Sequence, residues 1–170
     1  MSSMKDVRIE KLTLNIGAGK DQSRLEKGIM LIKNLTAMNP VKTFSNKRIP
    51  EWGIRPGLAI GCKLTLRKKK AEEILVRFLD AKNNTLKKRN FDDNGNVSFG
   101  IHEYIDIKDA KYDPKIGVMG LEVCITLERA GFRIKRKKNR KSIAKRHLIT
   151  KEDAISFMSK KFNVKLEEES

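Results

Sequence analysis

Apolar and polar residues alternate in three segments of the chain, residues 7–16, 59–67 and 121–128. A period of two is typical of a β-strand with one buried face and one exposed face. The sequence therefore predicts three half-buried strands. On two of them the polar side chains share one face, namely Lys11, Thr13 and Asn15 on the first strand and Lys63, Thr65 and Arg67 on the second.

Segments with a helical period separate these strands. Asp21 can cap a helix over residues 22–38, and a second helix is expected over residues 69–81. Thr150 and Asp153 resemble a capping box that opens a last helix. Strands with one polar face favour an antiparallel sheet. We therefore expect an α+β fold, a mainly antiparallel β-sheet with helices packed on one face and the other face open.

Two segments interrupt the periodic pattern. Residues 45–58 contain two Pro and two Gly, and we expect a long loop, which at this length is generally functional or disordered. Residues 131–147 form a basic extension. A chain of 170 residues is long enough for one domain with a real core. We therefore expect a single domain over residues 1–170 that carries both segments.

The positive charge is concentrated in two places. The chain has 38 Lys and Arg against 21 Asp and Glu, a formal net charge of +17. Residues 40–70 contribute +8 and residues 133–146 contribute +9, so the rest of the chain is balanced. Such a surplus indicates a polyanionic partner, with nucleic acid the first candidate and an anionic membrane surface the second. No apolar run reaches the roughly 18 to 20 residues of a membrane span, and no membrane partner is expected.

Residues that could support catalysis do not form a recognised site. Gly17 and Gly19 precede Lys20, but Asp21 follows where a phosphate-binding P-loop needs Ser or Thr. The two cysteines and two histidines lack a metal-ligand spacing, and no nucleophile has an adjacent base. We expect no enzyme, no metal and no cofactor. The glycine segment is either a turn that ends a strand or, with Lys20, a contact to an RNA phosphate near a helix N-terminus.

The remaining polar features favour RNA. The polar sheet face offers cations and hydrogen-bond donors but not the paired aromatics that stack single-stranded bases, so we expect it to recognise the shape of a structured RNA. Trp52 and Arg55 favour a contact surface over disorder in the 45–58 loop. The run 133–146 is interpreted as a phosphate-bound extension, with a solvated charge face and a nuclear-import signal as alternatives.

Four long motifs occur in order along the chain: "IEKLTLNIGAG" at 9–19, "GIRPGLAIGCKLTLR" at 53–67, "NFDDNGNVSFGIHEYI" at 90–105 and "YDPKIGVMGLEVCITL" at 112–127. Together they resemble the large-subunit ribosomal protein five family, the universal 5S rRNA-binding family that is called protein eleven in eukaryotes. The ending "KEDAISFMSKKF" and the basic run before it resemble the archaeal and eukaryotic branch. The resemblance extends over almost the whole chain.

The resemblance implies a structural, ribosome-bound cytoplasmic protein that lays one sheet face on 5S rRNA in the central protuberance. It implies RNA contacts by Asn15 and Thr65, and a long loop that reaches P-site tRNA. Further implied partners are large-subunit rRNA and neighbouring ribosomal proteins, including a small-subunit head protein at an intersubunit bridge. A ribosome-independent RNA-binding factor or RNA chaperone is the alternative.

Residue patterns and resemblance together nominate two sets of contacts. The expected rRNA-binding residues are Lys11, Thr13, Asn15, Lys20, Lys63, Thr65, Arg67, Arg136, Lys137, Lys138, Arg140 and Lys141. The expected tRNA-binding residues are Lys47, Arg48, Trp52 and Arg55.

Overall fold

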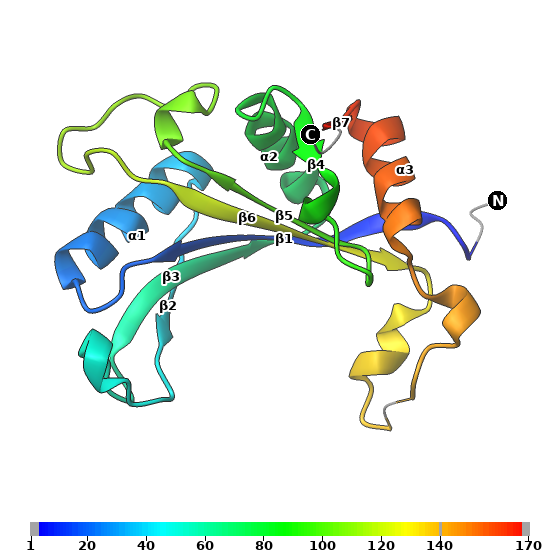
Figure 1. The fold of residues 1–170 in the computed structure, drawn as a ribbon, viewed down its shortest axis with the longest axis horizontal. Coiled ribbons are helices and arrows are strands. Elements are labelled where there is room, and N and C mark those ends of the chain that lie inside the picture. The colour runs from blue at the N-terminus through cyan, green and yellow to red at the C-terminus, as the bar shows by residue number, and fades with distance from the viewer. Residues whose placement is uncertain (1–3, 140, 168–170) are drawn as a thin grey trace. The chain divides into compact units, whose positions relative to one another are not determined.

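A computed structural model describes residues 4–139 and 141–167. Five strands form the main sheet in the order β2-β3-β1-β6-β5, and β4 pairs with β7 in a small parallel sheet (Figure 1). The strands of the described chain are β1 (Val7–Gly17), β2 (Val41–Phe44), β3 (Ala59–Leu66), β4 (Thr85–Lys87), β5 (Asn96–Ile101), β6 (Leu121–Arg129) and β7 (Lys165–Glu167). The helices are α1 (Gln22–Thr36), α2 (Lys68–Asp80) and α3 (Lys151–Phe162).

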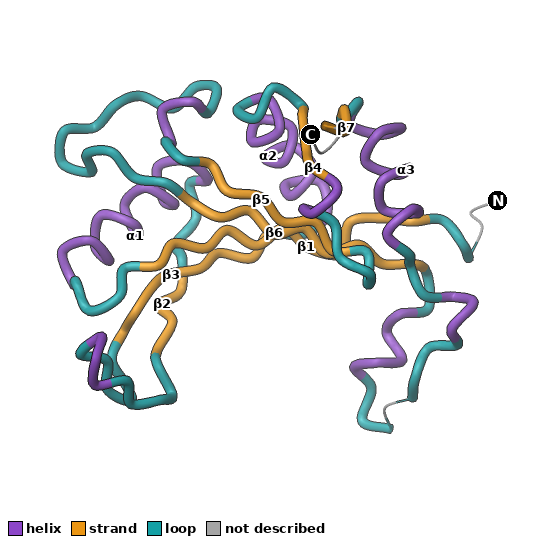
Figure 2. The backbone as a smooth tube through the Cα atoms, viewed as in Figure 1, coloured by secondary structure: helices purple, strands orange, loops and turns teal. Residues whose placement is uncertain are grey.

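The predicted fold class, an α+β fold with a mainly antiparallel sheet, is confirmed. Figure 2 shows the helices and strands joined by loops, the longest of which runs from the end of the short turn Tyr104–Asp106 to the start of β6. The chain divides into two compact units, and each is described separately. Unit 1 consists of Met1–Leu12, Arg67–Phe99 and Cys124–Ser170, and unit 2 consists of Thr13–Leu66 and Gly100–Val123. No helix among the described residues has the length and apolar character needed to cross a membrane.

In unit 2, helix α1 packs on the apolar face of β1 and β3. Asp21 caps the helix as predicted, because its carboxylate accepts hydrogen bonds from the backbone N–H groups of Ser23 and Arg24. Gly28 allows close packing, since a Cβ at this position would lie 3.2 Å from Ile16 Cγ2 and 3.3 Å from Cys62 Sγ. Burial raises the pKa of the Cys62 thiol, so the cysteine is a neutral core side chain.

In unit 1, helices α2 and α3 cover the apolar side of the unit. The two helices are joined by an ion pair of 2.6 Å between Lys161 Nζ and Glu72 Oε1. The predicted capping box of α3 is present, with Thr150 and Asp153 bonded reciprocally. The backbone N–H of Thr150 is the main cause that lowers the pKa of Asp153, and Arg129 contributes. Arg129 therefore ties the end of β6 to the start of α3.

The other side of each strand is polar. Strand β1 alternates as predicted from Leu12 to Ile16, but both Glu10 and Lys11 lie outside the core, between the buried Ile9 and Leu12. The alternation of buried and less buried residues is therefore interrupted between Ile9 and Leu12. Unit 1 also has a polar surface at this strand, where Arg8 is exposed and Glu10 and Lys11 are half-buried.

Candidate nucleic-acid interface

The open face of unit 2 holds four predicted RNA-binding residues. Thr13 and Asn15 on β1 are half-buried and point away from the core, and Lys63 and Thr65 on the adjacent strand β3 are exposed. Each is separated from the next on its strand by a buried apolar residue, so pleating alone aims them at the same side. We call these four residues the Asn15 patch. Its cation, hydroxyl and amide groups suit the 2′-hydroxyls and phosphates of folded RNA.

A carboxylate that sequence reasoning did not nominate lies next to this patch. Glu122 on β6 accepts a hydrogen bond of 3.1 Å from Asn15 Nδ2. The amide group of Asn15 is thereby oriented, with its carbonyl oxygen and second N–H still available. The alternation of residues 121–128 already placed Glu122 on a polar face, but it carried no information on which strand would lie beside β6.

The glycine segment is a turn and not a phosphate loop. The backbone N–H groups of Ala18 and Gly19 both donate to the carbonyl oxygen of Ile60, at 2.9 and 3.0 Å. The N-terminal N–H groups of α1 are bonded to Asp21, whose negative charge disfavours a phosphate there. Lys20 lies instead beside the 45–58 loop, since a Cβ at Gly53 would be 3.5 Å from Lys20 Cδ.

The long loop, residues 45–58, continues the β2–β3 hairpin in an ordered form (Figure 2). Ser45 N–H donates to Leu58 O at its base, and Ile49 and Ile54 exchange two backbone hydrogen bonds of 2.9 and 3.0 Å. A short turn, Pro50–Trp52, ends at Gly53, which adopts the left-handed conformation with φ of +65°. The loop is therefore held by backbone hydrogen bonds together with the Ser45 hydroxyl, which bonds to the backbone of Lys47, and with the buried Ile54.

The predicted tRNA-binding residues all lie on the surface of this loop. Trp52 is 65% exposed, an unusual state for the only tryptophan of the chain. Lys47, Arg48 and Arg55 are exposed as well. An exposed indole on the same loop as three exposed cations can stack on a base or a sugar while the cations meet phosphates.

The basic extension, residues 131–147, contains a small packed centre. Phe132 and Ile143 are buried, and the Phe132 ring meets the His147 ring edge-on at 5.7 Å. His147 Nε2 lies 2.9 Å from the carbonyl oxygen of Ala130, and Lys135 Nζ lies 5.0 Å from the centre of the Phe132 ring. The extension is thus anchored by side chains. Its predicted RNA-binding residues Lys137, Lys138 and Lys141 are exposed, and Arg140 falls outside the described residues.

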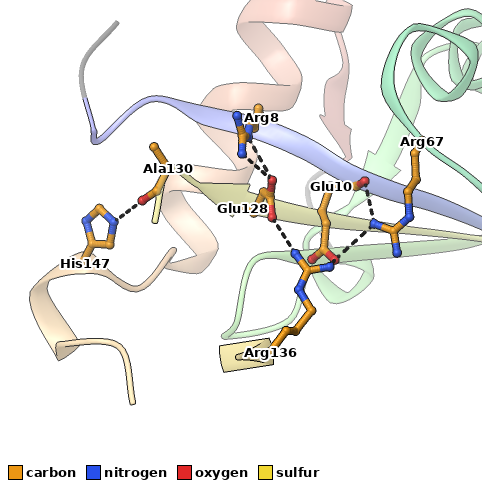
Figure 3. Close-up of polar contacts among 7 residues, drawn as sticks. All are labelled: Arg8, Glu10, Arg67, Glu128, Ala130, Arg136 and His147. Atoms are coloured by element: carbon orange, nitrogen blue, oxygen red, sulfur yellow. Dashed lines mark hydrogen bonds and ion pairs between the residues drawn. The ribbon is translucent and has the colours of Figure 1, made fainter. Parts of the chain in front are cut away.

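The open face of unit 1 brings three arginines to two carboxylates (Figure 3). Arg8 and Arg136 bind Glu128, and Arg136 and Arg67 bind Glu10. We call these five residues the arginine cluster. Sequence reasoning nominated Arg67 and Arg136 but missed the other three. Lys11, also nominated, is half-buried on β1.

Comparisons with known proteins agree over almost the whole chain. The family model described as Ribosomal protein L5 matches residues 2–55, and the model described as the C-terminus of this ribosomal family matches residues 59–157. The chain is 48% identical to the large ribosomal subunit protein uL5 of Sulfolobus acidocaldarius, over 95% of this chain and 91% of the relative. It is 45% identical to uL5 of Sulfurisphaera tokodaii, over 99% and 96%, and 43% identical to uL5 of Methanococcus maripaludis, over 96% and 92%. The chain therefore belongs to the ribosomal protein L5 family.

Proposed function

We propose that this chain is a structural RNA-binding protein of the large ribosomal subunit that anchors 5S rRNA in the central protuberance and contacts P-site tRNA. Its family membership supports the structural role in the large subunit. In this role it is non-catalytic and ribosome-bound in the cytoplasm. Large-subunit rRNA and neighbouring ribosomal proteins are its further partners, including a small-subunit head protein at an intersubunit bridge.

The Asn15 patch is the observation that carries the proposal for 5S rRNA. An amide and two hydroxyls stand on a rigid sheet next to Lys63, so their spacing is set before any RNA binds. A helical RNA surface displays 2′-hydroxyls and phosphates at regular intervals, and fixed donors and acceptors can match them without reading base sequence. The exposed cations of the extension add affinity through release of counterions.

The 45–58 loop carries the proposal for tRNA. Trp52 and its neighbouring cations are presented by a hairpin that is closed at both its base and its middle. A preorganised aromatic side chain loses little conformational entropy on binding. This loop is therefore suited to a partner that arrives and leaves, whereas the sheet and the extension are suited to a permanent RNA.

The decisive residue for 5S rRNA is Asn15. Asn15→Ala should weaken binding of a 5S rRNA transcript by about 1–3 kcal/mol, because a polar contact loses its partner. The slope of log K against log salt should stay the same, because no cation is lost. Filter binding or calorimetry at several salt concentrations measures both quantities.

Two control variants make this test specific. Asn34→Ala removes an exposed asparagine from α1 and should leave affinity unchanged. Glu122→Ala removes the intramolecular partner of Asn15 but keeps the amide, so it should cost less than Asn15→Ala. Equal affinity of Asn15→Ala and the wild type would remove the patch from the interface. Absence of the protein from large subunits after a moderate-salt wash would overturn the ribosomal assignment.

A further inference from the structure

In the arginine cluster of unit 1, arginines and carboxylates alternate in a continuous series of ion pairs (Figure 3). Arg8 approaches Glu128 Oε1 with its Nε at 2.9 Å and its Nη2 at 2.8 Å. Arg136 bridges the two carboxylates, with Nη2 at 3.3 Å from Glu128 Oε2 and Nη1 at 2.8 Å from Glu10 Oε1. Arg67 is the last member of this series, and its Nη1 lies 3.4 Å from both Glu10 Oε1 and the Glu10 carbonyl oxygen.

Within the cluster the two acidic side chains are more buried than the three arginine side chains. The side chains of Glu128 and Glu10 are 12% and 17% exposed, whereas those of Arg8, Arg136 and Arg67 are 63%, 52% and 49% exposed. Carboxylates that served only solubility would reach into water. Here they are held against the sheet, and each contacts two guanidinium groups from different parts of the chain. The outer surface of the cluster therefore consists of arginine.

The arginines keep donors for a ligand. A guanidinium has five N–H groups, and the bonds to the two carboxylates use at most two on each arginine. Arg8, Glu128 and Arg136 also line a pocket of about 510 Å³ together with Arg133 and Lys137. Four cations against one carboxylate leave this pocket strongly positive. Guanidinium groups at such a site match the geometry of phosphate oxygens.

We propose that Arg8, Arg67 and Arg136 bind a phosphate segment of the RNA, and that Glu10 and Glu128 are positioning residues that hold these guanidinium groups in place. The physical reason is conformational entropy. A free arginine samples many rotamers and must be ordered when RNA binds, whereas these three are already restrained by ion pairs to largely buried carboxylates. This inference rests on the proposed function, since the phosphate belongs to the bound rRNA.

Removal of one of the two acids should change RNA affinity in the direction opposite to that expected from simple electrostatics. Removing a negative charge from an RNA-binding surface ordinarily strengthens binding, because repulsion of phosphate decreases. If the acids position the arginines, Glu128→Gln should instead weaken binding of a 5S rRNA transcript by roughly fivefold or more, because order is lost. The slope of log K against log salt should become shallower by about 0.9 for each phosphate contact that is lost.

The experiment compares full-length variants in filter binding at several salt concentrations. Glu128→Gln and Glu10→Gln are the test variants, and thermal unfolding verifies that each is folded. Either variant alone tests the positioning role. Glu10→Gln therefore decides the question if Glu128→Gln fails to fold. Glu73→Gln on α2 is the matched control, since it removes the same charge from an exposed site and should leave affinity equal or slightly higher.

A double-mutant cycle separates positioning from general structural damage. In a background of Arg8→Ala and Arg136→Ala, Glu128→Gln should change affinity less than twofold, because the groups that it positions are gone. A loss that persists in this background would overturn the positioning role. So would equal or tighter binding by both Glu128→Gln and Glu10→Gln in the wild-type background. Failure of the wild-type chain to bind 5S rRNA at all would instead overturn the proposed function itself.

Discussion

The 45–58 loop, with a formal net charge of +2, and the basic extension at residues 131–147, with +9, are held in shape by different contacts. The loop at residues 45–58 is shaped by backbone hydrogen bonds, those of Ser45 with Leu58 and of Ile49 with Ile54. The extension at residues 131–147 is shaped by side chains that pack around Phe132. A backbone scaffold tolerates side-chain replacement, whereas a side-chain scaffold does not. We therefore expect the loop to tolerate replacement of its exposed contact residues, and the extension to be sensitive to loss of Phe132.

The segments also differ in what balances their cations. In the loop, Lys47, Arg48 and Arg55 are exposed beside the single acid Glu51. In the extension, Arg136 is bonded to two acids that come from the sheet. In the proposed tRNA contact, the exposed cations of the loop would have to be ordered when the partner binds. In the proposed rRNA contact, the extension would use at least one arginine, Arg136, that ion pairs already restrain, which lowers the entropic cost.

The largest expected effect separates the two segments by their RNA partner. Changing Lys137, Lys138, Arg140 and Lys141 to Gln should weaken 5S rRNA binding by roughly a hundredfold near 0.1 M salt, because several phosphate contacts are lost. The slope of log K against log salt should fall by up to about 0.9 for each contact. Changing Lys47, Arg48 and Arg55 to Gln should leave 5S rRNA affinity within about twofold and weaken P-site tRNA binding by large subunits. Equal losses of 5S rRNA affinity in both variants would contradict the assignment of the extension to 5S rRNA and of the loop to tRNA.

A smaller effect is expected from the anchor of the extension. Phe132→Ala removes a buried ring and should cost about 3 kcal/mol of local stability. Amide hydrogen exchange over residues 132–147 should then be roughly a hundredfold faster. Trp52→Ala is the matched change in the loop and should leave exchange over residues 45–58 unaltered, because the indole is exposed. Similar acceleration by both variants would show that the loop also depends on its side chains.

The smallest effect tests the backbone scaffold of the loop. Gly53 has φ of +65°, so Gly53→Ala should destabilise the loop by about 1–2 kcal/mol through conformation alone. The added methyl group meets only Lys20 Cδ, at an ordinary contact distance of 3.5 Å. Gly17→Ala is the control, because it has open space and no positive φ. Exchange rates of the Ile49 and Ile54 amides measure the difference, and identical rates in the two variants would contradict the backbone account.

Elements with a clear local signal were predictable from the sequence. The strands β1, β3 and β6 and the caps of α1 and α3 were expected within one or two residues, because alternation and capping depend on neighbours in the chain. The strand β2 was missed, since four mostly exposed residues carry no alternation. The hairpin form of the 45–58 loop was also missed, because its closing bonds join backbone groups, which any sequence offers.

The candidate site was predictable only in part. Alternation placed Thr13, Asn15 and Thr65 on polar faces, and the structure brings them to one open surface of unit 2. Composition located the cations but gave no indication of which ones would be paired. The acids Glu10, Glu122 and Glu128 were overlooked, because a carboxylate in a basic chain gives no signal until its neighbours in space are known.

The sequence by itself determined the faces of the strands, the location of the excess charge and, through its long motifs, the family. These properties are local, because the pleat of a strand and the charge of a segment do not depend on distant residues. Only the tertiary structure decided that Arg8 meets Glu128, which is 120 residues away in the sequence. The pairing of β1 with β6 is favoured because it buries the apolar side chains of the whole core. The free energy of that burial depends on many segments together, so it cannot be predicted from any single one.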